Sequence, residues 1–412
     1  MAAVTRPIPL RRTPRLRAEL SQLLFAASGV GLGLVLPRIT GGPQVSGPQA
    51  NELLIGLGFS VLGVTAVIFS LLFLVVQWAH TSFTPRLTLF GNAPFVWRTF
   101  AFAIGLVVFC LTAGLVIGTS SRVSTAVPGA AVVLLLLVLL ALLRTLQLKA
   151  LASIQLAPVL HAVTERGRLV LDALRSAASR PVAPVPAAAL PPLRSTVSWP
   201  RPMTILQQVD MERLLATARA AHAVVVLRVI PGTTLSFGAP VADIHTATEP
   251  PADQASADPA PAVLAALLTG AERTFDQDPL LAFRLLADIV LRALSPAVND
   301  PATAVQSLDC LEDLLTGQAG LPTGPLHVAD PDGHVRVVVE LPGRDEYLQT
   351  ALGDVVSASA HAPMVLLRLR TLLLHLAAGQ PADRDDLVQR RLAWAEQELA
   401  RRYPTLWDEA RP

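Results

Sequence analysis

The stretch LLIGLGFSVLGVTAVIFSLLFLVVQWA, which runs from Leu53 to Ala79, decides the fold class of this chain. It contains no Asp, Glu, Lys, Arg or His. A helix crosses the hydrocarbon core of a bilayer with about 20 consecutive, mainly apolar residues. The stretch exceeds that length, so we expect a membrane-spanning helix that tilts or extends into the interface.

Three other segments have the same character, namely Leu20–Pro37, Thr99–Ile117 and Ala126–Leu143. Charged residues make up 16% of the whole chain, against about 25% in an average soluble protein. Residues 20–143 carry almost none of them. This uneven distribution predicts a four-helix transmembrane domain at 20–143, followed by a soluble domain.

The first apolar segment admits a second interpretation. It is short and glycine-rich, and a basic arm at residues 1–19 precedes it, as in a signal peptide. The sequence that follows, LPRITGGP, has no small-x-small cleavage pattern, which favours a retained helix. Gly29 and Gly33 lie four residues apart, a spacing that favours close helix packing. We expect that packing inside one molecule rather than at a dedicated dimer face.

Lysine and arginine near the ends of the predicted helices indicate their orientation. They concentrate in the N-terminal arm, in the loop between the second and third helices, and after the fourth helix. The residues on this side are Arg6, Arg11, Arg12, Arg15, Arg17, Arg86, Arg98, Arg144 and Lys149, against Arg38 and Arg122 on the other. The bias predicts a multi-pass membrane protein with the N- and C-termini in the cytoplasm.

No charged residue or histidine lies within the four apolar cores. Such residues usually mark proton relays and ion pathways in membranes, so the sequence disfavours a proton-coupled pump. A pore lined by backbone groups or hydroxyls stays open as an interpretation, with hydroxyls at Ser60, Thr65, Ser70 and Thr112.

The rest of the chain is predicted to be a cytoplasmic α+β domain, mainly helical, with a small β module and a hairpin. Composition and periodicity divide it into a helical stalk, a proline-rich linker, a small β/α module, a flexible loop, a helical domain and a tail. The predicted boundaries are 144–180, 181–203, 204–244, 245–262, 263–402 and 403–412, with the hairpin near 325–341.

The stretch LSPAVNDPATAVQSLD, from Leu294 to Asp309, is the most distinctive part of the soluble half. Two aspartates in this region, Asp278 and Asp300, each precede a proline. Aspartate accepts hydrogen bonds from the first turn of a helix, and proline at the first helical position has no N–H to leave unpaired. We therefore expect helices at 279–294 and 301–315, and capping alone accounts for both aspartates.

Nine polar residues form the candidate functional cluster: Arg273, Asp276, Asp278, Arg284, Asp288, Arg292, Asn299, Asp300 and Thr303. Positions 284, 288 and 292 share a helix face, where a solvated i,i+4 ladder is the favoured interpretation. A subunit interface or an anion site is the rival. The aspartates at 276, 278 and 300 offer carboxylates to a divalent cation, although their spacing does not indicate ligation, and the metal is unknown. The sequence predicts no catalytic residue and no cofactor.

In these residues the chain resembles the bacterial predicted-membrane-protein family called domain of unknown function 2254. The resemblance lies in FTPRL (83–87), ILQQVDMERLLATA, PGTTLSFGAPV, ERTFDQDPLLAFRLLADIVLRALSPAVNDPATAVQSLDCLEDLL (272–315) and MVLLRLRTLL, and it covers nearly the whole chain. Val290 stands where the family pattern has alanine, and Thr204 where it has the glycine of a GYVQ strand. The resemblance implies an integral protein of the bacterial plasma (inner) membrane with a cytoplasmic C-terminal region, and it brings no established activity, substrate or cofactor.

Two main classes of function are consistent with these features. The first is a non-enzymatic oligomeric membrane protein, pore- or channel-like or a sensor, with a cytoplasmic assembly domain. The second is a membrane-anchored enzyme or metal-binding protein that uses the polar cluster between Arg273 and Asp300, although the chain has no G-x-S-x-G, H-E-x-x-H or P-loop pattern. A scaffold for another membrane protein is a further alternative. The expected partners are the lipid bilayer and further copies of the chain, and the net charge of +2 gives no support to nucleic-acid binding.

Overall fold

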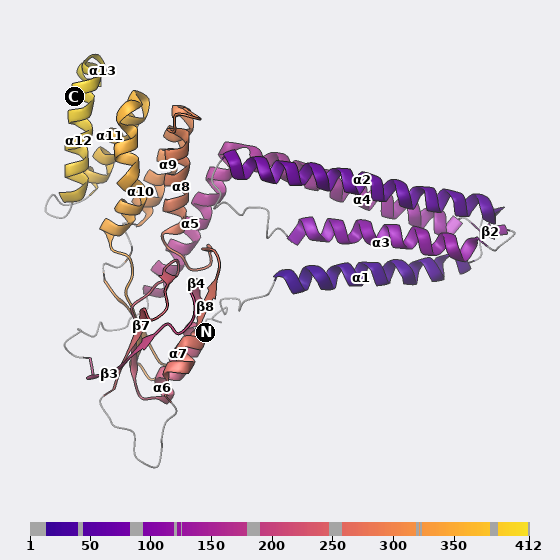
Figure 1. The fold of residues 1–412 in the computed structure, drawn as a ribbon, viewed down its shortest axis with the longest axis horizontal. Helices are drawn as coiled ribbons and strands as arrows, with labels where there is room; N and C mark the ends of the chain where they lie inside the picture. Colours follow the sequence, from indigo (N-terminus) through magenta and orange to yellow (C-terminus); the bar gives the residue numbers. More distant parts are fainter. Residues whose placement is uncertain are drawn as a thin grey trace, which may run out of the picture. The chain divides into compact units, whose positions relative to one another are not determined.

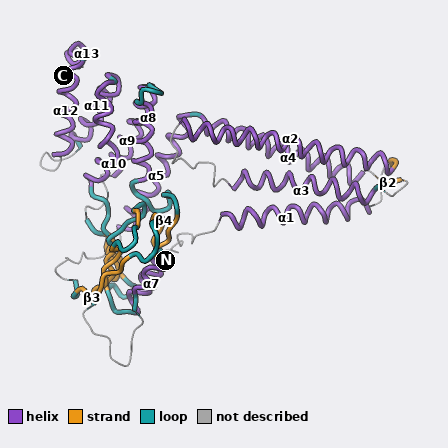
Figure 2. The backbone as a smooth tube through the Cα atoms, in the orientation of Figure 1, coloured by secondary structure: helices purple, strands orange, loops and turns teal. Residues whose placement is uncertain are grey.

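The computed structural model describes residues 14–39, 44–82, 94–118, 122–124, 126–178, 190–246, 258–318, 321, 324–379 and 386–410. The chain divides into two compact units, Met1–Leu156 and Ala157–Pro412. The first is a bundle of long helices (Figure 1), and the second combines helices with strands (Figure 2). The start of the predicted basic arm, the FTPRL segment, and residues 179–189 and 247–257 of the predicted linker and loop lie outside the described residues.

Within the described residues, the N-terminal unit has four helices that are long and apolar enough to cross a membrane. They are α1 (Pro14–Val35, continued by the 3-10 turn η1, Leu36–Arg38), α2 (Gly47–Ser82), α3 (Pro94–Ile117) and α4 (Ala126–Ile154). Their apolar windows, Leu20–Arg38, Gly47–Leu74, Phe95–Ile117 and Gly129–Leu148, lie at the four predicted spans. At 1.5 Å per residue, the 36 residues of α2 extend over about 54 Å, which exceeds a hydrocarbon core of about 30 Å.

Helix α3 is the central helix of this unit. It packs against α1, α2 and α4, and the side chains of Ala103, Phe109, Cys110 and Ala113 are buried in these contacts. Many large apolar side chains of α1, α2 and α4 are exposed instead. Outward apolar surfaces of this kind are what helices present to lipid, because lipid tails are as apolar as leucine.

The contact between α1 and α3 is close because glycine faces glycine. A Cβ atom at Gly29 would overlap the carbonyl oxygen of Gly105, and one at Gly33 would lie 2.8 Å from the Cβ atom of Thr112. Gly31, between them in sequence, has open space around it. Gly29 and Gly33 therefore pack inside the molecule, in the manner of small-xxx-small pairs in membrane helices.

Two short strands connect the loops at one end of the bundle. Strand β1 (Gln44–Ser46) follows η1, and β2 (Arg122–Ser124) precedes α4. They pair antiparallel, with Val45 opposite Val123. The two loops that the charge bias assigns to the outer side are therefore joined by a β ribbon.

The helical part of the C-terminal unit contains α5 (Leu156–Ala178), α8 (Leu281–Ala293), α9 (Pro301–Gly317), α10 (Arg344–Ala358) with the 3-10 turn η4 (Ser359–His361), α11 (Pro363–Ala378), α12 (Asp386–Arg402) and α13 (Pro404–Ala410). Helix α8 packs against α9 and α10, while α11 packs against α9 and α12. The tail predicted at 403–412 thus includes a short helix.

Helix α5 is packed into this unit rather than standing free as a stalk. It buries Val159, Val163 and Leu171, and Arg168 pairs with Asp313 of α9 at 2.6 Å. The chain bends at residue 155, so Pro158 falls in the first turn of α5, where proline is tolerated. The apolar face of α5 needs a partner in water, and α9 supplies one.

In the described part of the C-terminal unit, the strands form a larger sheet of order β3-β7-β5-β10-β9 and a smaller sheet of order β6-β4-β8. The strands are β3 (Leu193–Ser198), β4 (Thr204–Val209), β5 (Val224–Leu227), β6 (Thr234–Leu235), β7 (Pro240–His245), β8 (Leu267–Gly270), β9 (Leu326–Ala329) and β10 (Val335–Val339), with α6 (Met211–Ala220) and α7 (Ala260–Ala266) between them. Strands β5 and β10 are parallel, with Val225 opposite Val337, and the other neighbours are antiparallel. One apolar core, which includes Trp199, Leu206 and Leu214, unites both sheets with α6 and α7.

These pairings differ from the predicted organisation in three places. The segment 181–203, predicted as linker, contains β3, because its prolines flank the strand at a sheet edge, where proline is tolerated. The region from 263, predicted as helical, includes β8, which pairs with β4. The hairpin near 325–341 exists as β9 and β10, with Gly333 at φ 86° in its turn, but β10 completes the sheet of the β module.

Candidate functional site

The LSPAVNDPAT stretch forms a tight corner between α8 and α9. The amide of Asp300 donates to the carbonyl of Ala293 at 2.8 Å, and the amide of Asn299 donates to the carbonyl of Ser295 at 2.9 Å. Asn299 has a φ of 49°, in the left-handed region that asparagine adopts more readily than most residues. The presence of asparagine at position 299 is therefore accounted for by the backbone conformation of the turn between α8 and α9.

Asp300 caps α9 as predicted. Its Oδ1 accepts a hydrogen bond from the amide of Thr303 at 3.1 Å, and its Oδ2 accepts one from the hydroxyl of Thr303 at 2.6 Å. These two hydrogen bonds lower the pKa of Asp300 because they favour the ionised carboxylate. The cap also accounts for Thr303, and the helix continues to residue 317 rather than 315.

At the opposite end of α8, Asp278 takes part in a buried ion pair. Arg273 donates from Nε to Oδ2 at 2.6 Å and from Nη2 to Oδ1 at 2.7 Å. The side chain of Asp278 is 1% exposed and that of Arg273 is 28% exposed. Oδ1 also accepts from the amide of Leu280 at 3.0 Å. The prediction that Asp278 caps this helix is wrong, because α8 begins at 281 rather than 279 and its N-cap residue is Leu280, without a side-chain cap. The carboxylate of Asp278 instead holds the preceding turn, through Leu280 and Arg273.

The Pro231-Gly232 turn closes over the same ion pair. Gly232 has a φ of 97°, and a Cβ atom there would overlap the carboxylate of Asp278 and lie 2.8 Å from Nη2 of Arg273. The amide of Gly232 donates to the carbonyl of Leu206 in β4 at 2.7 Å. Glycine is required here because both the positive φ and the close approach exclude a side chain.

Gln277 binds the same segment to β4. Its Oε1 accepts from the amide of Val209 at 2.9 Å, and its Nε2 donates to the carbonyl of Val209 at 3.3 Å. Gln207 donates in turn to the carbonyl of Glu272 at 2.7 Å. Asp276, which lies within this segment, is exposed. The segment from 272 to 278 therefore joins the β module to the helices.

The predicted ladder on α8 includes an ion pair at its first step. Arg284 pairs with Asp288 at 2.9 Å, four residues along the helix, and it reaches Asp354 of α10 at 3.3 Å. The side chain of Arg292 is partly exposed on the same helix. These contacts fix α8 against α10, which is a structural role on the surface of the unit.

The nine predicted residues therefore form three groups rather than one site. Asp278 and Asp300 lie at opposite ends of α8, whose 13 residues are about 20 Å long. They cannot bind one cation together. Throughout the described ranges, no group of three or more His, Cys, Asp or Glu side chains is placed to hold a metal ion.

A fourth polar group was not predicted from the sequence. Glu312 of α9 contacts Arg368 of α11 and accepts a hydrogen bond from Nδ1 of His375 at 2.6 Å, while Arg368 donates from Nε to Asp309 at 2.5 Å. Burial raises the pKa of Glu312, but the hydrogen bonds from His375 and Arg368 outweigh burial and hold that pKa below its ordinary value. The signal in the sequence is spacing, because residues 368 and 375 share a face of α11 and residues 309 and 312 share a face of α9.

In three of these groups, charged side chains hold one secondary-structure element against another, whereas Asp300 caps the helix that follows it. Asp278 and Glu312 are each engaged by an arginine, and Asp300 is engaged by the start of α9. Charge-assisted hydrogen bonds of this kind are stronger than hydrogen bonds between neutral groups. The protein thus consists of a bundle of long helices and a unit of helices and strands. The polar residues described above stabilise the contacts between elements of the second unit.

Comparison with known proteins agrees with that class. The family model described as "Predicted membrane protein (DUF2254)" matches residues 20–375. The match covers most of the chain, and the chain belongs to this family of predicted membrane proteins.

The chain is also similar to uncharacterized proteins of Mycobacterium bovis and of two strains of Mycobacterium tuberculosis. Each is 36% identical over 111 residues, which cover 26% of this chain and 21% of the relative. The chain therefore spans about a fifth of the length of these relatives in the match. No solved structure matches the chain.

Proposed function

We propose that this chain is a non-enzymatic, oligomeric membrane protein, in which several copies of the helical bundle form a pore-like assembly and the C-terminal unit serves assembly or sensing. The orientation that the charge bias favours puts both termini in the cytoplasm of a bacterial cell, at the inner membrane. The observation that carries the proposal is a face of α2 that one copy leaves uncovered.

This face of α2, here called the α2 stripe, consists of Gly56, Ser60, Gly63 and Ser70. These residues recur at i, i+4, i+7 and i+14, so they share one side of the helix. All four are exposed, and Cβ atoms at Gly56 and Gly63 would have open space around them. The opposite side of α2, with the buried Val61 and Thr65, packs against α3.

Small residues and hydroxyls on a membrane helix permit a second helix to approach closely. In α1 the corresponding glycines contact α3 within the same copy, whereas the α2 stripe has no such contact among the described residues. A second copy of α2 is the occupant that fits a long apolar helix with small residues on one side. Assembly through this stripe would place Ser60 and Ser70 between copies.

One copy of the bundle also offers little room for a polar path. Its interior is filled by apolar side chains of α3, such as Leu106 and Phe109, and the apolar cores at 20–37, 53–79, 99–117 and 126–143 contain no charged residue. A conduit would therefore need to form between copies. The metal or enzyme alternative has less support because its proposed residues lie in separate groups.

The test is the mass of the particle in nanodiscs, for the unmodified chain and for Gly56→Leu with Gly63→Leu. We expect several copies in the unmodified particle and fewer in the double variant. Gly31→Leu is the matched control, because Gly31 also has open space but lies on α1. A monomer in every case would overturn the proposal.

Conductance of the assembled particle in planar bilayers then separates a pore from a sensor or scaffold. Discrete currents that the double variant abolishes would support the pore. If intact oligomers in the bilayer carry no current, the proposal of an oligomer stands and the proposal of a pore is overturned. A cysteine at Gln397, accessible to reagents only from the cytoplasmic side, tests the orientation.

A further inference from the structure

Helix α2 continues past the point where its neighbour α3 ceases to be apolar. The rings of Phe69 and Phe100 lie 4.7 Å apart, and a Cβ atom at Gly58 would lie 3.3 Å from the Cβ atom of Cys110. The two helices are therefore antiparallel. Arg98 precedes Phe100 by two residues, so it is level with the α2 residue two positions after Phe69. This exposed arginine marks the end of the apolar part of α3.

Helix α1 has its boundary at nearly the same level. A Cβ atom at Gly29 would overlap the carbonyl oxygen of Gly105, and the next contact along α1 is with a later residue of α3, so these two helices are parallel. The apolar window of α1 begins at Leu20, nine residues before Gly29. Leu20 is therefore close to the level of Arg98, and two neighbours of α2 agree on where the apolar core ends.

Beyond this level, α2 remains apolar. Residues 71–79, LLFLVVQWA, contain no charged residue, and the helix continues to Ser82. At 1.5 Å per residue the nine residues extend over about 13 Å, whereas a headgroup layer is about 5 to 7 Å deep. Helix α4 extends at the same end (Figure 1), but it carries Arg144 and Lys149 there. The segment 71–79 is here called the α2 overhang.

Two leucines of the overhang lie on the same side of α2 as the α2 stripe. Val67 follows Gly63 of the stripe at i+4, and Leu71 and Leu74 follow Val67 at i+4 and i+7. Val67 is 59% exposed, Leu71 is 56% exposed and Leu74 is 60% exposed. One side of α2 thus changes from glycine and serine within the apolar core to leucine beyond it.

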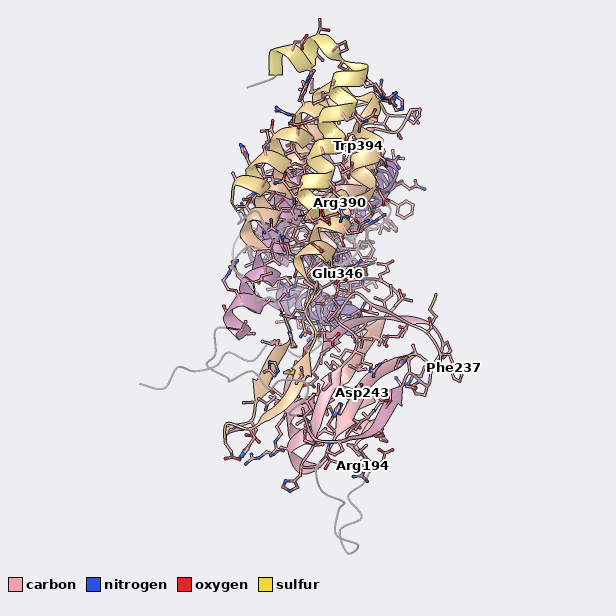
Figure 3. The ribbon with its side chains drawn as sticks, turned by 90° about the vertical axis from the view of Figure 1, so that its left-hand side faces the viewer. Arg194, Phe237, Asp243, Glu346, Arg390 and Trp394 are labelled. Carbon is pink, nitrogen blue, oxygen red and sulfur yellow. The ribbon has the colours of Figure 1, made fainter. Side chains whose placement is uncertain are left out.

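This change in side-chain size accompanies a change of solvent. Among lipid tails, helices associate by close approach of their backbones, which small residues permit. In contact with water, large apolar side chains favour association because burial removes them from water, and the spacing of 67, 71 and 74 is that of a coiled-coil seam. An outer helix without such a contact has charge on its exposed side, as α12 has at Arg390, one turn before Trp394 (Figure 3).

A second copy of the chain is the partner that fits the overhang. All copies insert into the membrane in the same orientation, so the overhangs of neighbouring copies are parallel and lie at the same depth. We propose that Leu71 and Leu74 of two copies pack against each other and continue the contact of the α2 stripe beyond the apolar core. The inference rests on the proposed assembly through α2, and it adds a contact that depends on water rather than on lipid.

The experiment is disulfide formation between copies of the full chain in nanodiscs, with Cys110 and Cys310 replaced by alanine. Single cysteines are introduced by Leu71→Cys or Leu74→Cys. Phe73→Cys is the matched control, because Phe73 is 67% exposed but lies about 100° around the helix from Leu74. We expect severalfold more cross-linked dimer at positions 71 and 74 than at position 73.

A second variant tests whether the contact holds the copies together. Leu71→Gln with Leu74→Gln keeps the helix uncharged but removes two apolar side chains from the contact. The dissociation constant of the particle in nanodiscs should rise about tenfold or more. Phe73→Gln is the control and should leave that constant nearly unchanged.

Two outcomes would overturn this inference alone. One is equal cross-linking at 71, 73 and 74, which indicates random collision between copies. The other is a multi-copy particle that does not cross-link at 71 or 74 and that the double glutamine variant leaves intact, so that assembly through the α2 stripe stands without the overhang. A particle with a single copy would instead overturn the proposed assembly, and this inference with it.

Discussion

The α1–α3 contact and the contact between the β module and α8 both depend on a glycine, but for different reasons. At Gly29 the neighbour is a backbone carbonyl of Gly105, and the nearest atoms to a Cβ there all belong to the backbone of α3. At Gly232 the neighbour is the ion pair of Arg273 and Asp278. In lipid, helices gain most from close approach of their backbones. In the C-terminal unit a desolvated charge pair, whose removal from water is costly, demands a close-fitting cover.

The largest expected effect falls on the charged contact. Asp278→Asn leaves Arg273 without its carboxylate, and breaking a buried pair costs about 3 kcal/mol, near the low end of the usual range because Arg273 is partly exposed. Thermal unfolding of the detergent-solubilised chain measures the loss. Asp276→Asn, two residues away and exposed, is the control and should cost less than about 0.5 kcal/mol. Equal losses in the two variants would show that the pair does not hold the β module against α8.

The stability of the contact between α1 and α3 should depend on side-chain volume and not on charge. Gly29→Ala puts a methyl group against the carbonyl of Gly105, and overpacking of this kind costs about 1 to 3 kcal/mol. Gly31→Ala, where space is open, should be nearly neutral. The thermal midpoints of the two variants should differ by the same amount at pH 5 and pH 8. A pH-dependent difference would contradict a purely steric contact.

A smaller effect is expected at the cap of α9. Asp300→Ala removes both hydrogen bonds to Thr303 and should cost about 1 kcal/mol. Because the pKa of Asp300 is lower in the folded chain, its contribution is present above the unfolded pKa of about 3.9 and is lost as the pH falls through the folded value.

Asp300→Ser is the companion variant, because serine also caps a helix but does not ionise in this range. Unfolding curves between pH 7 and pH 2 should show that Asp300→Ser keeps most of the stability and loses part of the pH dependence. A serine variant as unstable as the alanine variant would argue against capping as the role of this residue.

The smallest effect belongs to the surface pair on α8. Arg284→Gln removes contacts with Asp288 and Asp354, and partly exposed pairs of this type contribute a few tenths of a kcal/mol. The difference from the unmodified chain should shrink further at 1 M salt, where charges are screened. A loss of stability as large as that of Asp278→Asn would indicate that Arg284 also contacts a second copy of the chain.

Some of these features could be predicted because they depend on neighbours along the chain. Apolar length located the four spans, and the Asp-Pro pair at Asp300 located the start of α9. The pairing of Asp278 with Arg273 beneath Gly232 could not be predicted, because a local cap already accounted for the aspartate. Strand β3 could not be predicted because prolines surround it. The Glu312 network could not be predicted because helix periodicity shows which residues share a face of one helix but not which other helix packs against that face.

The parallel pairing of β5 with β10 has a consequence for synthesis of the chain. Val225 meets Val337, so one edge of β5 stays open while more than 100 further residues are translated. At about 5 to 20 residues per second, the delay is on the order of 5 to 20 s. During that time α8 and α9 emerge from the ribosome and can pair locally, whereas the β module is incomplete. An open strand edge of this kind is a site for binding by chaperones or for misassociation between nascent chains.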